Sequence, residues 1–176
     1  LTMDYLQQLF SDVSLMVPTT GAIVCAVLSC VLLIFSGYAS GSEIAFFSLS
    51  PNDLNELDEE KNDSDRLITE LRDDSERTLA TILITNNLVN VTIIMLCNYF
   101  FSHVIDFGTA IWLQFLVITV LLTFLLLLFG EIMPKVYATQ HALAFCRFSA
   151  PGTKRLRGLF YPFASVLIRS GVLADD

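Results

Sequence analysis

The sequence predicts an all-α integral membrane protein with three transmembrane helices plus juxtamembrane, amphipathic helices on the cytoplasmic side. Hydrophobic residues make up 54% of the 176 residues and the mean hydropathy is +0.63, which is too apolar for a soluble domain of this length. Three apolar stretches are each about as long as a bilayer core requires. Charged residues gather between and after these stretches. We therefore treat residues 1–176 as a single transmembrane domain.

The first predicted span covers residues 17–38, and no charged residue occurs between Asp12 and Glu43. Small residues crowd the end of this span. Gly37 and Gly41 lie four positions apart and form a GxxxG face, which lets another helix approach closely.

Ser36 and Ser40 have the same spacing, so their hydroxyls lie on one helical face. Serines in membrane helices often bond back to their own backbone carbonyls. The alternative is that they supply two neutral oxygen ligands to a cation. The first interpretation is the preferred one when this helix is considered alone.

Residues 51–77 form a polar helical segment with eleven acidic and four basic residues. Apolar residues recur at helical spacing, which predicts two short amphipathic helices joined near residues 62–64. Asp53 and Asp65 are expected to be their N-caps. The acidic run is interpreted as a solvated face, with attraction of divalent cations as the alternative.

The second predicted span, residues 78–101, contains three asparagines within five residues: Asn86, Asn87 and Asn90. A buried amide must find a partner or it costs several kcal/mol. That partner is either another helix or an ion. Three amides exceed what helix association requires, which favours a binding site.

The third predicted span, residues 107–130, has no charged residue and ends at Glu131. An ionisable group at membrane depth marks a functional site by default. Pro134 lacks the N–H that would bond the Gly130 carbonyl in a helix. A free carbonyl beside a carboxylate suits a hard cation such as Mg²⁺ or Na⁺. The alternative is a proline kink, with Glu131 reaching the interface and pairing with Lys135.

Residues 137–173 alternate basic and aromatic side chains, which predicts interfacial helices along the membrane surface. All ten Lys and Arg lie between the first two spans or after the third. The positive-inside rule then predicts a multi-pass protein of the cell (inner) membrane with its N-terminus outside and its C-terminus cytoplasmic. Membrane lipid is thus one partner, and the net charge of −8 argues against nucleic acid.

The polar features of the three spans are expected at similar depth near the cytoplasmic side. Their hydroxyl, amide, carbonyl and carboxylate oxygens are about the right number for six-coordinate Mg²⁺. The candidate ligands are Ser36, Ser40, Asn86, Gly130 and Glu131, with Asn87 and Asn90 as a second tier. No thiolate or imidazole is expected at this depth, which disfavours zinc and copper. Glu131 also lacks an adjacent Ser/His or Cys/His pair, so we expect no enzymatic activity.

Three motifs occur in order along the chain: Ser-Gly-Tyr-Ala-Ser-Gly-Ser-Glu at 36–43, Asn-Asn-Leu-Val-Asn at 86–90 and Phe-Gly-Glu-Ile-Met-Pro-Lys at 129–135. Together they resemble the transmembrane domain of the CorC/cyclin M (CNNM) family of magnesium transporters. The resemblance implies three transmembrane helices, a belt of juxtamembrane helices and a homodimer. It also implies a Mg²⁺ site open to the cytoplasm and Mg²⁺ export coupled to Na⁺ entry.

Carried over residue by residue, the resemblance implies the five candidate ligands named above, with Pro134 as the helix breaker that frees the Gly130 carbonyl. Thr85 departs from the pattern, because a glycine often precedes the first asparagine. Family members usually continue into a cytoplasmic CBS-domain pair, absent from this chain and expected as a partner if the chain is a fragment. The alternative function is a non-transporting membrane scaffold of the same fold, as in a haemolysin-like or gliding-motility-associated member.

Overall fold

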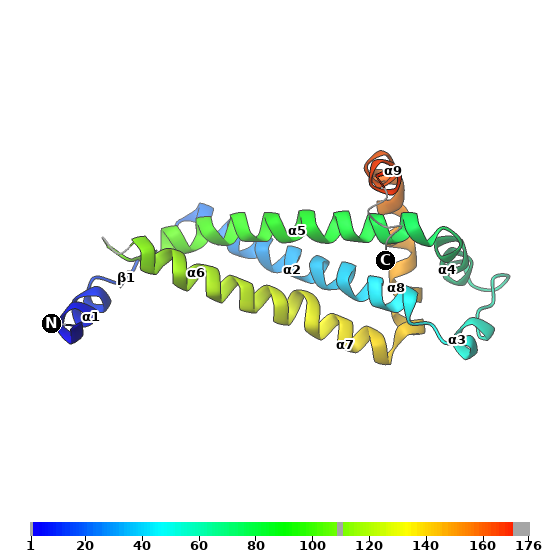
Figure 1. The fold of residues 1–176 in the computed structure, drawn as a ribbon, viewed down its shortest axis with the longest axis horizontal. Helices are drawn as coiled ribbons and strands as arrows, with labels where there is room; N and C mark the ends of the chain where they lie inside the picture. The colour runs from blue at the N-terminus through cyan, green and yellow to red at the C-terminus, as the bar shows by residue number, and fades with distance from the viewer. Residues whose placement is uncertain (1, 109–110, 171–176) are drawn as a thin grey trace.

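A computed structural model describes residues 2–108 and 111–170, and three long helices lying side by side dominate it (Figure 1). Each is long and apolar enough to cross a membrane, which confirms the predicted all-α membrane domain with three spans. The spans are α2 (Thr20–Phe47), α5 (Ser75–Val104) and a third helix made of α6 (Ile111–Leu125), the π-helix η1 (Leu126–Ile132) and α7 (Met133–Gln140).

The helices are longer than the predicted spans. α2 continues to Phe47 beyond the expected end at residue 38, and the third helix continues to Gln140 beyond residue 130. The predicted limits marked apolar stretches of the sequence, and both helices continue beyond these stretches. Residues 109–110 of the predicted third span and 171–173 of the predicted interfacial segment lie outside the described residues.

The GxxxG face of α2 packs within the chain. A Cβ atom at Gly37 would lie 3.0 Å from Cγ of Pro134, and one at Gly41 would overlap the ring of Phe145. Pro134 belongs to α7 and Phe145 to α8 (Ala142–Leu159). Both glycines are therefore needed for the close approach of α7 and α8 to α2.

The polar segment forms α3 (Pro51–Asn55) and α4 (Asp63–Asp73), but the two predicted N-caps are wrong. Ser50 and Asn62 cap these helices instead. The Ser50 hydroxyl accepts the Asp53 N–H, and the Asp53 carboxylate accepts the Ser50 N–H at 2.9 Å. Asp53 is thus the third residue of a capping box, a role that its position three residues after a serine explains.

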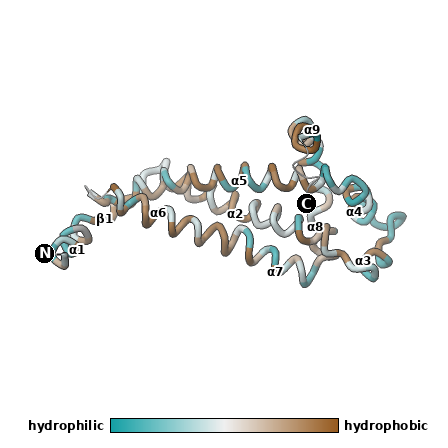
Figure 2. Tube along the Cα trace, viewed as in Figure 1, coloured by the Kyte–Doolittle hydropathy of each residue, from teal (hydrophilic) through white to brown (hydrophobic). Residues whose placement is uncertain are grey.

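α8 and α9 (Tyr161–Arg169) run across one end of the three spans, where α4 also lies (Figure 1). We call this end the base of the bundle. Polar residues concentrate around α3 and α4, whereas apolar residues dominate the spans (Figure 2). The main apolar core joins α2, α4, α5, α7 and α8 at the base and consists of Ala45, Phe46, Ile68, Leu71, Ile82, Ala138, Cys146 and Ala150.

The opposite end of the bundle is joined to the N-terminal segment. α1 (Thr2–Ser11) leads into β1 (Ser14–Leu15), which pairs antiparallel with β2 (Ile105–Asp106) after α5. Packing is sparse at this end, since α6 buries only Ile118 and Leu122 among its described residues.

Candidate metal centre

Two serines of α2 face two asparagines of α5. The Ser36 hydroxyl donates to Oδ1 of Asn86 at 3.1 Å and to Oδ1 of Asn90 at 2.6 Å, and the Ser40 hydroxyl donates to Oδ1 of Asn86 at 3.4 Å. Both serines are 0% exposed and Asn86 is 9% exposed. Four side-chain oxygens therefore converge at one place; we call these residues the serine–asparagine cluster.

These contacts show that Ser36 and Ser40 bond to another helix and not to carbonyls of their own helix. Ser29 and Ser42 on the same helix bond back to the carbonyls of Cys25 and Tyr38, both at 2.7 Å. Ser36 and Ser40 instead reach across to the next helix. The neighbouring Asn87 is exposed and makes no side-chain hydrogen bond with any residue that the structure describes.

The third helix approaches the cluster through Gly130. A Cβ atom at this buried glycine would lie 3.2 Å from Oγ of Ser36. Gly130 lies within the π-helix η1, where the Met133 N–H bonds the Leu128 carbonyl five residues earlier instead of four. Such widened segments are rare and frequently occur at functional sites.

The π-helix adds a second carbonyl to the one that Pro134 is expected to leave free. In a continuous α-helix, the N–H that Pro134 lacks would have bonded the carbonyl of Gly130, four residues earlier. In the observed register, the carbonyl five residues before Pro134 is that of Phe129. Phe129 also loses its α-helical partner, because the Met133 N–H bonds Leu128. The expectation based on an α-helix therefore missed Phe129.

The carbonyl of Phe129 is turned toward α2. Its oxygen lies 3.5 Å from the Cβ position of Gly37, immediately after Ser36. The ring of Pro134 packs on the same glycine. A ligand role for the Gly130 carbonyl stays a prediction, and the Phe129 carbonyl is a further backbone oxygen that faces α2 at Gly37.

Glu131 follows Gly130 in the same π-helix and is half-buried. It makes no hydrogen bond or ion pair with any residue that the structure describes. The alternative pairing with Lys135 is wrong, because the Lys135 ammonium lies 3.8 Å from the Glu43 carboxylate. An unpaired, half-buried carboxylate in a membrane-spanning helix marks a candidate functional group, and it directly follows the glycine that approaches Ser36.

The composition of the centre restricts which metals suit it. Within residues 2–108 and 111–170, no group of three or more His, Cys, Asp and Glu is arranged to hold a metal. A cation here would be bound by hydroxyl, amide and backbone oxygens with Glu131 as the acidic ligand. Such a set suits a hard cation.

Gly130→Ala is expected to lower the affinity for Mg²⁺ about tenfold, since the added methyl group crowds Ser36 and shifts a ligand. The matched control is Gly158→Ala, because a Cβ atom at Gly158 meets nothing within 4 Å. Isothermal titration calorimetry measures both variants. Equal affinities would contradict the placement of Gly130 against the centre.

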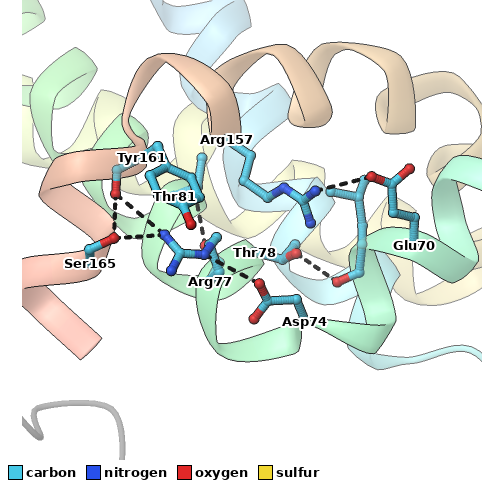
Figure 3. A network of polar contacts seen from close by, with 9 residues as sticks. Glu70, Asp74, Arg77, Thr78, Thr81, Arg157, Tyr161 and Ser165 are labelled. Atoms are coloured by element: carbon cyan, nitrogen blue, oxygen red, sulfur yellow. Dashed lines mark hydrogen bonds and ion pairs between the residues drawn. The ribbon is translucent and has the colours of Figure 1, made fainter. Parts of the chain in front are cut away.

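At the base, Arg77 connects the start of α5 to α9 (Figure 3). Its Nη1 donates to Oγ of Ser165 at 2.9 Å and to the Tyr161 carbonyl at 3.3 Å, and its guanidinium lies 3.9 Å from the centre of the Tyr161 ring. Nε donates to Asp74 at 3.2 Å. These contacts fix the position of the helix that carries both asparagines of the cluster.

Ion pairs join α4 to α8. Glu70 accepts from Lys154 at 3.0 Å and from Arg157 at 3.1 Å. The hydrogen bond from Lys154 lowers the pKa of Glu70, and the charges of both basic groups outweigh the opposing effect of burial.

Asp65 is the buried acid of this interface, with 1% of its surface exposed. Arg147 donates to both of its carboxylate oxygens, at 2.8 and 3.2 Å, and the Asp58 N–H donates at 2.9 Å. Burial alone would raise the pKa of Asp65, but the hydrogen bonds and the charge of Arg147 leave the pKa below its ordinary value. The solvated face predicted for the acidic run thus does not extend to Asp65.

Comparison with known families identifies the family of the chain. The profile of the cyclin M transmembrane N-terminal domain matches residues 27–173, which include all residues of the candidate centre. The chain belongs to this family. The resemblance seen in the sequence is thereby confirmed.

Two proteins with similar sequences illustrate the relationships of this cyclin M domain. A UPF0053 protein of Haemophilus influenzae is 35% identical over 133 residues, 75% of this chain and 30% of the relative. The metal transporter cnnm-4 of Caenorhabditis elegans is 37% identical over 112 residues, 60% of this chain and 22% of the relative. The chain thus spans less than a third of the length of either relative.

Proposed function

We propose that this cyclin M domain binds Mg²⁺ through Ser36, Ser40, Asn86, Gly130 and Glu131 and carries it across the membrane. The main support is the convergence of buried serine and asparagine oxygens from two spans, with the third span touching Ser36 through Gly130. The relative named as a metal transporter supports the same class of function.

The ligand chemistry agrees with Mg²⁺ as a transported ion. Mg²⁺ prefers oxygen ligands in octahedral geometry and keeps some of its water. The serine hydroxyls now donate to the amide oxygens, so binding needs only that they rotate and offer their lone pairs. One carboxylate leaves a positive charge uncompensated. This permits release, which a transporter requires.

The proposed direction is Mg²⁺ export coupled to Na⁺ entry, from a site that opens to the cytoplasm in a homodimer. The distribution of Lys and Arg supports a cytoplasmic base and an outside N-terminus. A CBS-domain pair would be the cytoplasmic partner of the base.

The decisive test compares two adjacent asparagines. Asn86→Ala is expected to abolish Mg²⁺ binding in calorimetry, because it removes an amide oxygen shared by both serines. Asn87→Ala is the matched control and should bind like the wild type, since Asn87 is exposed. Both variants should elute as folded protein in size-exclusion chromatography. Equal binding by both would reject the centre.

One observation favours a second candidate, a scaffold that transports nothing. The hydroxyls of the cluster already have partners without an ion, as in hydrogen bonds that merely hold membrane helices together. Under this alternative, the purified wild type would not bind Mg²⁺, and Asn86→Ala would change only the melting temperature.

A further inference from the structure

A cavity of about 190 Å³ lies between the three spans and has no role so far. α2, α5, α6 and η1 all contribute to its wall. The lining residues are Ala26, Ser29, Cys30, Leu33, Ile93, Cys97, Phe100, Phe101, Leu122, Leu125 and Leu126.

The cavity lies on the side of the metal centre that faces away from the base. On α2 its residues precede Ser36, on α5 they follow Asn90, and on the third helix they precede Gly130. Because α5 runs antiparallel to the other two spans, the lining residues of all three helices lie on the same side of the centre. An ion that crosses the membrane through the centre must pass this level.

The wall offers a cation no ligands. Apart from two thiols, its polar side chain is Ser29, and that hydroxyl donates to the Cys25 carbonyl at 2.7 Å. An apolar cavity stays dry, and a cation without ligands or water is strongly disfavoured there. Hydrophobic constrictions close ion paths in this way, by excluding water.

The boundary between the centre and the cavity is made of aliphatic side chains. Cδ1 of Leu33 lies 3.7 Å from the Cβ position of Gly130, so Leu33 contacts both the centre and the cavity. Ile93 is 3% exposed and lies three residues after Asn90. Leu126 is the first residue of the π-helix.

We propose that Leu33, Ile93 and Leu126 form a hydrophobic barrier that closes the ion path on the far side of the metal centre. This inference rests on the proposed transport function. Ions pass only when the three spans separate enough for water to enter the cavity. The barrier therefore prevents leakage while the centre is open to the base.

Two variants of one residue test the barrier. Ile93→Asn extends the row of amides one turn into the cavity, whereas Ile93→Ala also shortens the side chain but stays apolar. In liposomes containing a Mg²⁺-sensitive dye, without Na⁺, Ile93→Asn should raise the rate of Mg²⁺ entry on the order of tenfold over the wild type. Ile93→Ala should stay close to the wild-type rate.

The native thiol of Cys97 reports hydration of the cavity directly. A charged thiol reagent needs water to reach it, so Ile93→Asn should increase its labelling on the order of tenfold. The double variant Ile93→Asn with Cys97→Ala shows how much of the added labelling occurs at Cys97, because its other cysteines are unchanged. If Ile93→Asn does not fold, Leu122→Asn introduces the same group from α6.

The possible outcomes distinguish a failure of the barrier proposal from a failure of the proposed transport function. Calorimetry should give wild-type Mg²⁺ affinity for Ile93→Asn, because the substitution lies outside the centre. Normal binding without leak or added labelling would overturn the barrier and leave the function standing. If Mg²⁺ entered liposomes equally fast with Ile93→Ala, the proposal would also be overturned, because the leak would then not depend on a polar side chain that admits water. A wild type that binds no Mg²⁺ rejects both proposals.

Discussion

Mg²⁺ affinity is expected to fall on the order of a hundredfold when Glu131 is replaced by glutamine, since charge count dominates the affinity of oxygen sites. The amide keeps the shape of the side chain and removes its charge. Glu131 supplies the negative charge of the proposed ligand set. Calorimetry on the purified protein measures the change.

Glu43→Gln is the matched control for this prediction. Glu43 is also a carboxylate of a membrane-spanning helix, but its charge is partly neutralised by Lys135 at 3.8 Å. Its loss should leave Mg²⁺ binding close to that of the wild type. If both substitutions weaken binding equally, the effect is long-range electrostatics and Glu131 is no ligand.

Arg147→Ala is expected to destabilise the fold by about 3–5 kcal/mol, because it leaves a buried carboxylate without its cationic partner. Asp65 would keep only the Asp58 N–H of the hydrogen bonds described above. Arg66→Ala is the control, since Arg66 pairs with Asp63 at the surface and exposed pairs contribute about 0–1 kcal/mol. Thermal melting in detergent at pH 7 compares the two variants.

The effect of Arg147 should depend on pH. The pKa of Asp65 is lower in the folded than in the unfolded protein, so the stabilisation is complete above the ordinary pKa of 3.8 and is lost as the pH falls through the folded value. In Arg147→Ala, burial raises the pKa of Asp65, and protonation then relieves the buried charge. The difference in melting temperature should therefore shrink toward pH 4 and below. A difference that is constant with pH would contradict this role for Asp65.

Composition and charge distribution predicted the fold class well. Long apolar stretches have few alternatives to membrane helices, which is why the three spans were identifiable. The ends of the helices were not predicted, because the helices continue past the apolar stretches that defined the spans. Gly37 and Gly41 were expected to allow close packing, and Pro134 and Phe145 pack on them. The caps were misassigned because Asp53 and Asp65 are each the third residue of their helix, after the true caps Ser50 and Asn62.

The contacts of the serine–asparagine cluster were predicted in part. Helical spacing alone placed Ser36 and Ser40 on one face, and depth along the spans placed Asn86 opposite them. The π-helix was not predictable, because a shift from four-residue to five-residue hydrogen bonding depends on how the third span packs on α2. Consequently, sequence reasoning considered the carbonyl of Gly130 and overlooked that of Phe129.

The buried side chains of α5 end at Ile93, and those of α2 are concentrated from Ser36 onward. The bundle is therefore rigid at one end and only loosely held at the other. Opening toward the loosely held end requires no repacking of the residues that join α2 to α4 and α8. The three spans can thus bend apart at that end while the apolar core at the base stays intact.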